Sequence, residues 1–447
     1  MSNNLDLKKG LDIPIGGAAA REVKRKVAPG IVAIQPTCFP GFLPRLLVKE
    51  GERVLAGSPV MADKQNQDIL LTSPASGTVK QIVRGDKRKL LAVVIAADTK
   101  QEYVDFGTKR PADAAAARSL LLSSGLWPAI IQRPYGIIAD PVLKPKAIFI
   151  SSFSTAPLAP DTDFTLGDRL QDLQAGVDTL ALLTDGGVHL SVNKAVAAKS
   201  VFSKVERVIS HTVSGKHPAG NVGVQISHIS PIRKGETVWT VSPTLVAAIG
   251  RLVNTGRLDL TRKVAVTGPG LISEPTYIEA LPGTPVKDLA PLSGDIRIIS
   301  GDVLSGRSVG LDGYLGFHDD QITVLTEGYE REFFGWLLPY RPNVFSSSPT
   351  AFSWLTPGKK YDMDTNYHGG RRAFVQSKCF EDVTPMEIFP IYLIKACLAG
   401  DIEKMEKFGI YEVLPEDLAL CDFVDPSKND IQAIIQSGID LMIKEMA

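Results

Sequence analysis

Cysteine is scarce in this chain, because only 4 of its 447 residues are cysteines. So few cysteines argue against a disulfide-built scaffold and for a reducing compartment. No two of them have the Cys-x₂-Cys spacing of a structural zinc site, and the 6 histidines follow no metal-ligand spacing either. The sequence therefore predicts no metal site on this chain.

An excess of charge of one sign is also missing, because 49 basic and 49 acidic residues give a formal net charge of zero. The densest basic patch, Lys24-Arg25-Lys26, is short, so nucleic acid is not an expected partner. The longest apolar run is Leu90 to Ala97, whereas a membrane-spanning helix needs about 20 such residues. Residues 1–10 lack the apolar core of a signal peptide. We therefore expect a chain that reaches a membrane only through partner proteins.

Four stretches of different character predict an α/β multidomain chain. Residues 1–100 contain short strands separated by glycines, which predicts an N-terminal β domain. Residues 101–257 alternate apolar runs with helices that end at Gly125 and Gly256, which predicts an open, Rossmann-like α/β domain. Its expected buried strands are Lys146 to Ile150, Leu180 to Leu183 and Val205 to Ile209.

The C-terminal half continues with a second β region and then with helices. Residues 258–330 predict a small β-grasp module. Residues 331–447 predict a linker arm, rich in proline, serine and aromatic residues, followed by a helical domain. A helical pattern from Met386 to Gly409 is expected to break or kink near Pro390.

Two segments of this helical domain look like ferredoxin motifs that have lost their cysteines. A cluster-binding segment reads Cys-x₂-Cys-x₂-Cys-x₃-Cys-Pro, because thiolates at these spacings reach the irons of a [4Fe–4S] cube. The slots before Pro426 are Pro415, Leu418, Cys421 and Asp425, and those before Pro385 are Phe374, Ser377, Phe380 and Thr384. A carboxylate ligates iron weakly compared with a thiolate, so these slots predict no cluster. A motif without ligands also arises by chance, and an ordinary proline corner remains the alternative.

Each of these corners also carries a helix-capping pattern. Thr384 is followed three residues later by Glu387, and Ser427 is followed by Asp430 at the same spacing. We therefore expect one helix to open at each of the two prolines.

The order of these regions resembles the A subunits of the sodium-translocating NADH:quinone reductases of bacterial membranes. More distantly, it is similar to the C subunit of the Rnf complex and to the NADH-binding subunit of respiratory complex I. The strings that carry the resemblance are KKGLDIPIGG at 8–17, SPASG at 73–77, HPAGN at 217–221, HGGRRAFV at 368–375 and EDLALC at 416–421. Residues 1–100 also look like a biotinyl/lipoyl hammerhead, and residues 258–330 like an SLBB module of the β-grasp type.

The resemblance implies a six-subunit assembly that oxidises NADH, reduces ubiquinone and exports Na⁺. In it, NADH, FAD, FMN, riboflavin and iron–sulfur centres belong to partner subunits. The member that this chain resembles is peripheral and lies on the cytoplasmic face of the bacterial inner membrane. Its implied partners are the five other subunits, chiefly the integral membrane B subunit. The implied role is support of ubiquinone reduction, with no catalytic residue and no tightly bound cofactor on this chain.

Two kinds of ligand site can be tested on the residues. Dinucleotide binding needs a glycine-rich phosphate cradle after the first strand, and residues 151–157 contain no glycine, so we expect that site to be lost. Apolar stretches with nearby donors predict a quinone contact, although the same stretches suit packing against other domains or chains. The residues of this predicted contact are Phe39, Phe42, Arg45, Arg133 and Tyr135.

Two other functions stay open at this point. One is a self-sufficient, flavin-dependent NADH dehydrogenase of the complex I type. The other is a carrier domain modified on Lys64, which lies near the hairpin that lipoyl domains modify, although an exposed turn lysine is the simpler interpretation.

Overall fold

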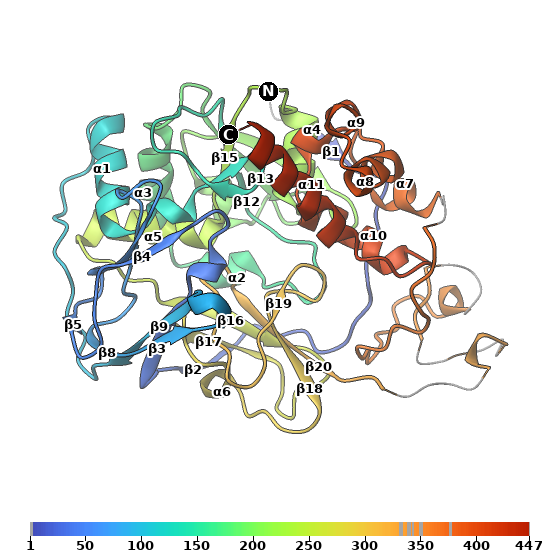
Figure 1. Cartoon of the computed structure of the whole chain (residues 1–447), viewed down its shortest axis with the longest axis horizontal. Coiled ribbons are helices and arrows are strands. Elements are labelled where there is room, and N and C mark those ends of the chain that lie inside the picture. The colour runs from blue at the N-terminus through green and yellow to red at the C-terminus, as the bar shows by residue number, and fades with distance from the viewer. Residues whose placement is uncertain are drawn as a thin grey trace.

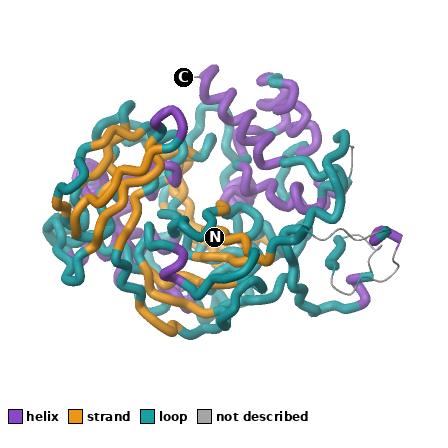
Figure 2. The backbone as a smooth tube through the Cα atoms, turned by 60° about the horizontal axis from the view of Figure 1, so that its bottom comes forward, coloured by secondary structure: helices purple, strands orange, loops and turns teal. Residues whose placement is uncertain are grey.

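The computed structural model describes residues 3–329, 334–337, 341, 344–347, 352–374 and 378–446. Within these residues the strands form four sheets, and a separate cluster of helices lies near the C-terminus (Figures 1 and 2). This arrangement confirms the predicted α/β multidomain class. The described helices include none that is long and apolar enough to cross a membrane. Ser377, one predicted cluster slot, lies outside the described residues.

Residues 31–97 fold into two small antiparallel sheets. The first has the strand order β3 (Ile31–Ile34), β9 (Leu90–Ala97), β8 (Gly77–Arg84), β5 (Arg53–Val54), and the second β4 (Pro44–Leu46), β6 (Pro59–Asp63), β7 (Leu70–Thr72). Strand β9 is the longest apolar run of the sequence, and Val93 and Ile95 are fully buried in the core of this region. Lys64 lies in the exposed turn between β6 and β7.

A seven-stranded sheet forms the centre of the molecule. Its order is β1 (Asn3–Asp6), β14 (Ile209–Ser214), β13 (Val188–Asn193), β12 (Ile148–Ser151), β15 (Val238–Thr240), β10 (Ile131–Arg133), β11 (Ile137–Ile138). The first five strands in this order are parallel to one another. Strand β10 is antiparallel to β15, and β11 is antiparallel to β10. The helices of this region are α1 (Ala114–Ser124), α2 (Thr162–Leu166), α3 (Leu170–Ala181), α4 (Val222–Ile229) and α5 (Pro243–Thr255).

Two of the three predicted strands of this sheet were wrong in type or position. The run Leu180 to Leu183 belongs to the end of helix α3, because its leucines continue the buried face of that helix. The run Val205 to Ile209 is mostly loop, and strand β14 begins only at Ile209. The predicted helices were right, and they end at Gly125 and Gly256, both in the left-handed conformation (φ 74° and 67°).

The third region is a six-stranded sheet with one short helix. Its order is β19 (Arg307–Ser308), β18 (Ile296–Ser300), β20 (Gln321–Thr326), β16 (Arg262–Thr267), β17 (Thr276–Ala280), β2 (Val23–Lys26), with α6 (Val286–Leu289) beside it. The N-terminal segment contributes one strand to each of two sheets before the chain enters the N-terminal β domain. Strand β1 pairs with β14 of the central sheet, and β2 pairs with β17 here.

The C-terminal region is helical. Its helices are α7 (Cys379–Val383), α8 (Pro390–Ala399), α9 (Ile402–Phe408), α10 (Ala419–Val424) and α11 (Ile431–Met446). The 3₁₀ helices among the described residues are η1 (Pro36–Cys38), η2 (Asp86–Arg88), η3 (Trp127–Ala129), η4 (Val201–Lys204), η5 (Gly335–Leu337), η7 (Ser353–Leu355), η8 (Ile410–Glu412) and η9 (Pro415–Leu418). The expected break near Pro390 is confirmed, since α8 begins there.

The helices predicted to open at Pro385 and Pro426 do not start there. They begin at Pro390 and Ile431, a few residues later. The second corner is a turn because both oxygens of the Asp425 carboxylate accept backbone N–H groups, from Ser427 and Asn429 at 2.9 Å each. Asp430 then caps α11 by accepting the N–H of Ala433 at 3.0 Å.

Candidate functional site

The two predicted ferredoxin-like corners lie side by side in the core of the C-terminal helices. The hydroxyl of Thr384 lies 3.6 Å from the sulfur of Cys421, and both side chains are buried. Asp425 is buried too, but its carboxylate is directed to the backbone of its own turn. The structure thus brings Thr384 and Cys421 together and leaves Asp425 with a local structural role.

Large apolar side chains fill the space around these corners. Leu418 and Phe380, two of the predicted slots, have no solvent exposure, and Phe374 packs on Phe380 with ring centroids 5.9 Å apart. Burial raises the pKa of the Cys421 thiol to about 12, so it is a neutral thiol near pH 7. Because cluster binding needs thiolates, this donor set does not fit a [4Fe–4S] cluster. No group of three or more His, Cys, Asp or Glu in the described ranges is arranged to hold a metal ion.

A buried ionic contact joins the α/β domain to the C-terminal helices. The guanidinium of Arg133, at the end of β10, donates to Asp417 Oδ2 at 2.7 Å and to Glu416 Oε1 at 2.6 Å. Arg133 and Asp417 are 1% and 2% exposed. Asp417 also accepts the backbone N–H of Leu414 at 3.0 Å, which fixes the carboxylate within η9.

This ion pair lies on the first turn of helix α4. A Cβ atom built on Gly223 would lie 2.3 Å from both Arg133 Nη1 and Asp417 Oδ2, so only glycine leaves room for the pair. Asn221, the residue before α4, donates its side-chain amide to the backbone oxygen of Glu416 at 3.1 Å. A helix N-terminus attracts anions through its free N–H groups and its dipole. Here the carboxylate of Asp417 lies beside the first turn of α4, together with the guanidinium of Arg133.

The same helix start lies at the edge of the sheet where doubly wound folds bind dinucleotides. The sheet order 14-13-12-15 places the reversal of strand order between β12 and β15. At the end of β12, the Ser151 hydroxyl donates to the oxygen of Gly220 at 2.8 Å, and Gln225 Nε2 donates to Ser151 at 2.9 Å. A Cβ on Gly220 would lie 2.5 Å from the backbone nitrogen of Thr155. The loop before α4 therefore packs directly on the loop that follows β12.

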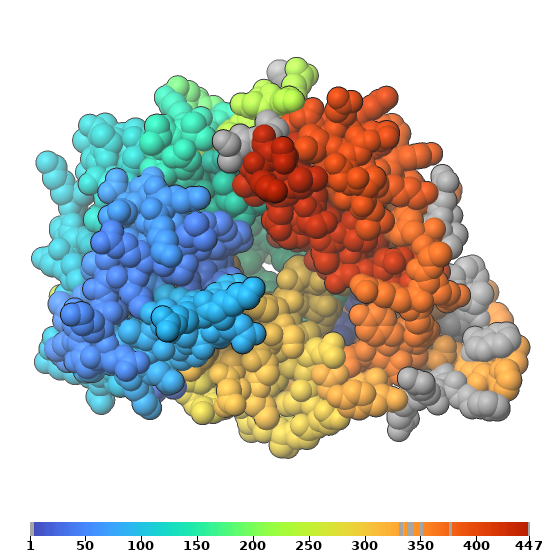
Figure 3. All heavy atoms as spheres, in the orientation of Figure 1, coloured from blue at the N-terminus to red at the C-terminus, as the bar shows by residue number. Residues whose placement is uncertain are grey.

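A small polar cavity of about 160 Å³ remains at this junction. It is lined by Ser154, Ala156, His217, Asn221, Asp302, Leu304, Ser305, Glu416 and Ala419. Sites for drug-sized ligands usually measure about 300–1,000 Å³, so the cavity is too small for a flavin nucleotide. His217 Nδ1 lies 3.2 Å from Thr155 Oγ1, and burial lowers the pKa of its imidazole. Figure 3 shows that the visible face is hollowed where the N-terminal β domain, the region of the six-stranded sheet and the C-terminal helices meet.

The residues of the predicted quinone contact do not line one cavity. Phe39 and Phe42 are buried, with ring centroids 6.3 Å apart, and Phe39 borders a gap of only about 30 Å³. Arg45 is exposed on β4, and Tyr135 is half-buried with its ring 6.3 Å from that of Tyr411. The guanidinium of Arg133 is hydrogen-bonded to the carboxylates of Asp417 and Glu416.

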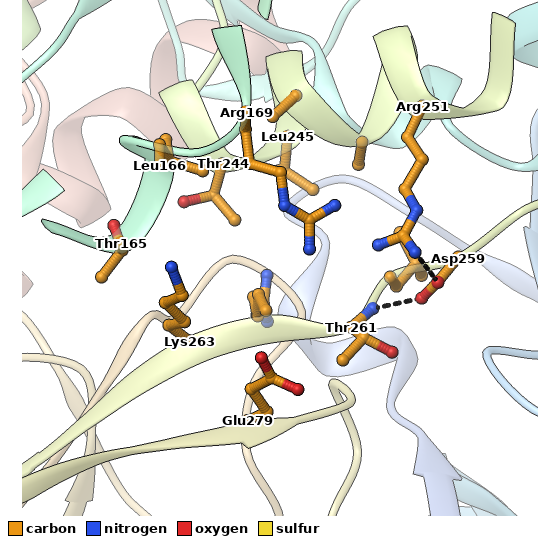
Figure 4. A pocket seen from close by; sticks show the side chains of 14 residues that line it. Thr165, Leu166, Arg169, Thr244, Leu245, Arg251, Asp259, Thr261, Lys263 and Glu279 are labelled. Carbon is orange, nitrogen blue, oxygen red and sulfur yellow. Dashed lines mark hydrogen bonds and ion pairs between the residues drawn. The ribbon is translucent and has the colours of Figure 1, made fainter. Parts of the chain in front are cut away.

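A second crevice lies between the α/β domain and the six-stranded sheet (Figure 4). It measures about 40 Å³ and is lined by several cationic side chains. Each of these cations has an acidic partner: Arg169 pairs with Asp172, Arg251 with Asp259, Arg262 with Asp320 and Lys263 with Asp168. With its charges paired and little space, the crevice is a polar domain contact rather than a phosphate site.

Sequence reasoning did not mark Asp417, Glu416 or Gly223 as site residues. The first two belong to the EDLALC string at 416–421, but their partner Arg133 lies 284 residues from Asp417. The residues around each position do not predict a contact between residues so far apart in the sequence.

Three family models match separate parts of the chain. They are described as the NqrA N-terminal barrel-sandwich hybrid domain (residues 5–98), the NqrA second alpha/beta domain (residues 112–258) and the NQRA C-terminal domain (residues 263–310). The chain is also similar over its length to proteins named as the A subunit of a Na(+)-translocating NADH-quinone reductase. The Rhodopirellula baltica protein is 36% identical, with 98% of each chain covered. The Serratia proteamaculans protein is 36% identical and the Neisseria meningitidis protein 34%, each with 99% of this chain and 100% of the relative covered.

Proposed function

Because the chain belongs to the family of Na⁺-translocating NADH-quinone reductase A subunits, we propose that it acts as a peripheral subunit of such an enzyme. Its place is on the cytoplasmic face of the membrane subunits, chiefly the B subunit, in an assembly with five other subunits. Its role is to support the ubiquinone reduction that is coupled to Na⁺ export. The redox cofactors of the reaction, namely NADH, FAD, FMN, riboflavin and iron–sulfur centres, reside on the partners.

The observation that carries this proposal is the closed state of both former cofactor positions. The carboxylate of Asp417 lies on the first turn of α4, where a nucleotide phosphate would need the N–H groups. At the cluster slots, Leu418 and Phe380 occupy the space that thiolates and iron would need. A chain built in this way holds partners together and does not pass electrons through a group of its own.

The contact between the two corners supports a ferredoxin-like origin for the C-terminal helices. In two-cluster ferredoxins the fourth cysteine of one motif ligates the cluster of the other motif. Thr384 is the fourth slot of the first corner, and Cys421 is the third slot of the second. Their contact at 3.6 Å makes these two slots neighbours, as the crossed arrangement predicts, with no space between them for a cluster. We likewise interpret residues 1–100 as hammerhead-like and the central sheet as Rossmann-like.

We also propose that ubiquinone contacts this chain at the Phe39–Phe42 loop and the adjacent Tyr135 turn. Arg133 is paired with its two carboxylates, whereas Arg45 is exposed on β4 and Tyr135 is half-buried beside Tyr411. Gly41 packs on Ile137 of β11, so the Phe39–Phe42 loop and the Tyr135 turn are neighbours. We propose that these residues form one side of an apolar quinone site and that a membrane subunit forms the other side.

A visible spectrum of the isolated chain tests the proposal. We expect no flavin or iron–sulfur absorption, with less than about 0.1 flavin or iron per chain. Removing the chain from the purified enzyme should abolish ubiquinone reduction while NADH oxidation with an artificial acceptor continues. Flavin or iron in a one-to-one ratio would overturn the proposal and favour the complex I-type dehydrogenase. A mass increment on Lys64 would favour the carrier domain.

A further inference from the structure

Three aromatic rings form an exposed cluster on the C-terminal helices. Phe389 and Tyr392 lie 6.5 Å apart between ring centroids, Phe389 and Phe408 6.1 Å, and Tyr392 and Phe408 5.6 Å. Phe389 is 58% exposed and Tyr392 48% exposed, although both rings are large and apolar. Helices α8 and α9, which carry the cluster, lie at the upper right of Figure 1.

The local fold explains why these rings face outward. Helix α8 begins at Pro390 and buries Leu393 and Ile394 completely, so Tyr392 on the opposite side points away from the core. The backbone N–H of Phe389 donates to the oxygen of Phe408 at 3.4 Å, which joins the start of α8 to the end of α9. The outward direction of the cluster is therefore fixed by backbone structure.

Two carboxylates without a counter-ion lie next to this cluster. Glu387 precedes Phe389 by two residues, and Glu412 follows the Gly409 turn, which packs on Ile388. In the described part of the chain, neither carboxylate has an ion pair or a hydrogen-bonded donor. Burial, and then the charge of Glu387, raise the pKa of Glu412 to about 7. A carboxylate whose charged form is disfavoured in this way is stabilised when a cation arrives beside it.

We propose that the surface formed by Phe389, Tyr392, Phe408, Glu387 and Glu412 binds a lysine- or arginine-bearing segment of a membrane partner protein. This inference rests on the proposed function, which places the chain at the cytoplasmic face of membrane subunits. Cytoplasmic loops of membrane proteins carry an excess of Lys and Arg, which supplies the partner chemistry. The cation is attracted by the faces of the rings, and its charge is neutralised by the carboxylates.

The surface suits a protein segment better than a lipid bilayer. The cytoplasmic leaflet is negatively charged and attracts polybasic segments. In the described stretches of the chain, the unpaired charges beside these rings have both signs, because the exposed Lys407 precedes Phe408 and Glu387 and Glu412 lie on the other side of the cluster, so the surface is not polybasic. Aromatic residues at the centre of a patch with charged groups at its rim are also the composition of protein–protein hot spots. The partner is therefore a basic peptide segment that also brings apolar side chains.

Site-specific photo-cross-linking in the intact enzyme complex tests this surface. A photoreactive phenylalanine analogue replaces Tyr392, and the cross-linked peptide is sequenced after irradiation. The expected product joins position 392 to a stretch of a membrane protein that contains Lys or Arg. A product with lipid, a product with a stretch free of basic residues, or the absence of any cross-link would overturn the inference.

Charge reversal gives a second, quantitative arm. Glu387→Lys, at an exposed position, should weaken retention of the chain in the complex by about tenfold or more in a salt titration. Asp68→Lys is the matched control, because Asp68 is exposed in the turn after β6 and should leave retention unchanged. Equal thermal unfolding of both variants shows that folding is intact. If Glu387→Lys is retained like the unchanged chain, the surface is wrong while the proposed function stands. If the unchanged chain itself does not co-purify with membrane subunits, the proposed function fails.

Discussion

Arg133 and Asp417 are 284 residues apart in the sequence, yet their side chains form a buried ion pair of 2.7 Å on the backbone of Gly223. The pair ties strand β10 and helix α4 of the central domain to η9 of the C-terminal region. Its carboxylate and guanidinium both lie against the Cβ position of Gly223, in the first turn of α4. One buried contact thus joins the central domain to the C-terminal helices.

Removing one partner of this pair should be costly. Asp417→Ala leaves the guanidinium of Arg133 buried without its fully buried carboxylate partner, and we expect the free energy of unfolding to fall by about 3–5 kcal/mol in a urea titration. Asp185→Ala is the control, because the Lys144–Asp185 pair is exposed and should contribute less than about 1 kcal/mol. The double variant Arg133→Met/Asp417→Leu should recover much of the loss. A fall of less than about 1 kcal/mol for Asp417→Ala would show that the pair does not hold the domains together.

Gly223 should tolerate no side chain. In Gly223→Ala the new methyl group would meet Arg133 Nη1 and Asp417 Oδ2 at 2.3 Å, so the ion pair must move. Alanine favours a helix interior by up to about 1 kcal/mol over glycine, so a net destabilisation here measures the clash. We therefore expect a lower thermal midpoint for Gly223→Ala. Gly438→Ala is not a suitable control, because Gly438 also packs tightly, against Cys397. An exposed glycine with open space, Gly370, is the appropriate comparison.

Sequence patterns predicted most elements of the fold but not its long-range contacts. Gly125 and Gly256 mark helix ends because their left-handed conformation is a local property. The run Leu180 to Leu183 was misassigned because four apolar residues fit a buried strand and the end of an amphipathic helix equally well. Strand β13 (Val188–Asn193) was missed because His189 and Ser191 interrupt its apolar pattern. The sequence does not predict that Asp417 and Arg133 form an ion pair, because only the tertiary structure brings them together.

The carboxyl of Glu412 predicts a pH dependence of stability. Its pKa is raised to about 7 in the folded chain from an ordinary value of 4.5, so the folded state holds the proton more tightly than the unfolded state. The resulting stabilisation is complete below about pH 4.5 and is lost as the pH rises through about 7. Because the group is half-exposed, we expect a gain of about 1 kcal/mol for Glu412→Gln at pH 8 and no gain near pH 4.

Chemical unfolding of the two proteins at pH 4, 6 and 8 measures this difference. Glu236→Gln is the comparison, because the pKa of Glu236 is lowered by its hydrogen bond with Lys146, and its pH profile should have the opposite sign. Parallel profiles for Glu412→Gln and the unchanged chain would contradict the expected proximity of Glu387 and Glu412.

Cys421→Ser tests whether the last cysteine of the two corners has any redox role. A serine hydroxyl can keep the contact with Thr384, so we expect a loss of about 1 kcal/mol or less in the free energy of unfolding. Since burial keeps the thiol neutral near pH 7, iron and flavin contents of the enzyme complex should not change. Ubiquinone reduction should also stay within about twofold of the unchanged enzyme, as expected for a buried, neutral thiol without a redox role. Iron analysis, absorption spectra and steady-state rates of the assembled complex measure these outcomes. A variant that assembles fully but loses activity would show that the Cys421 sulfur takes part in electron transfer, and the scaffold interpretation of the C-terminal helices would then be wrong.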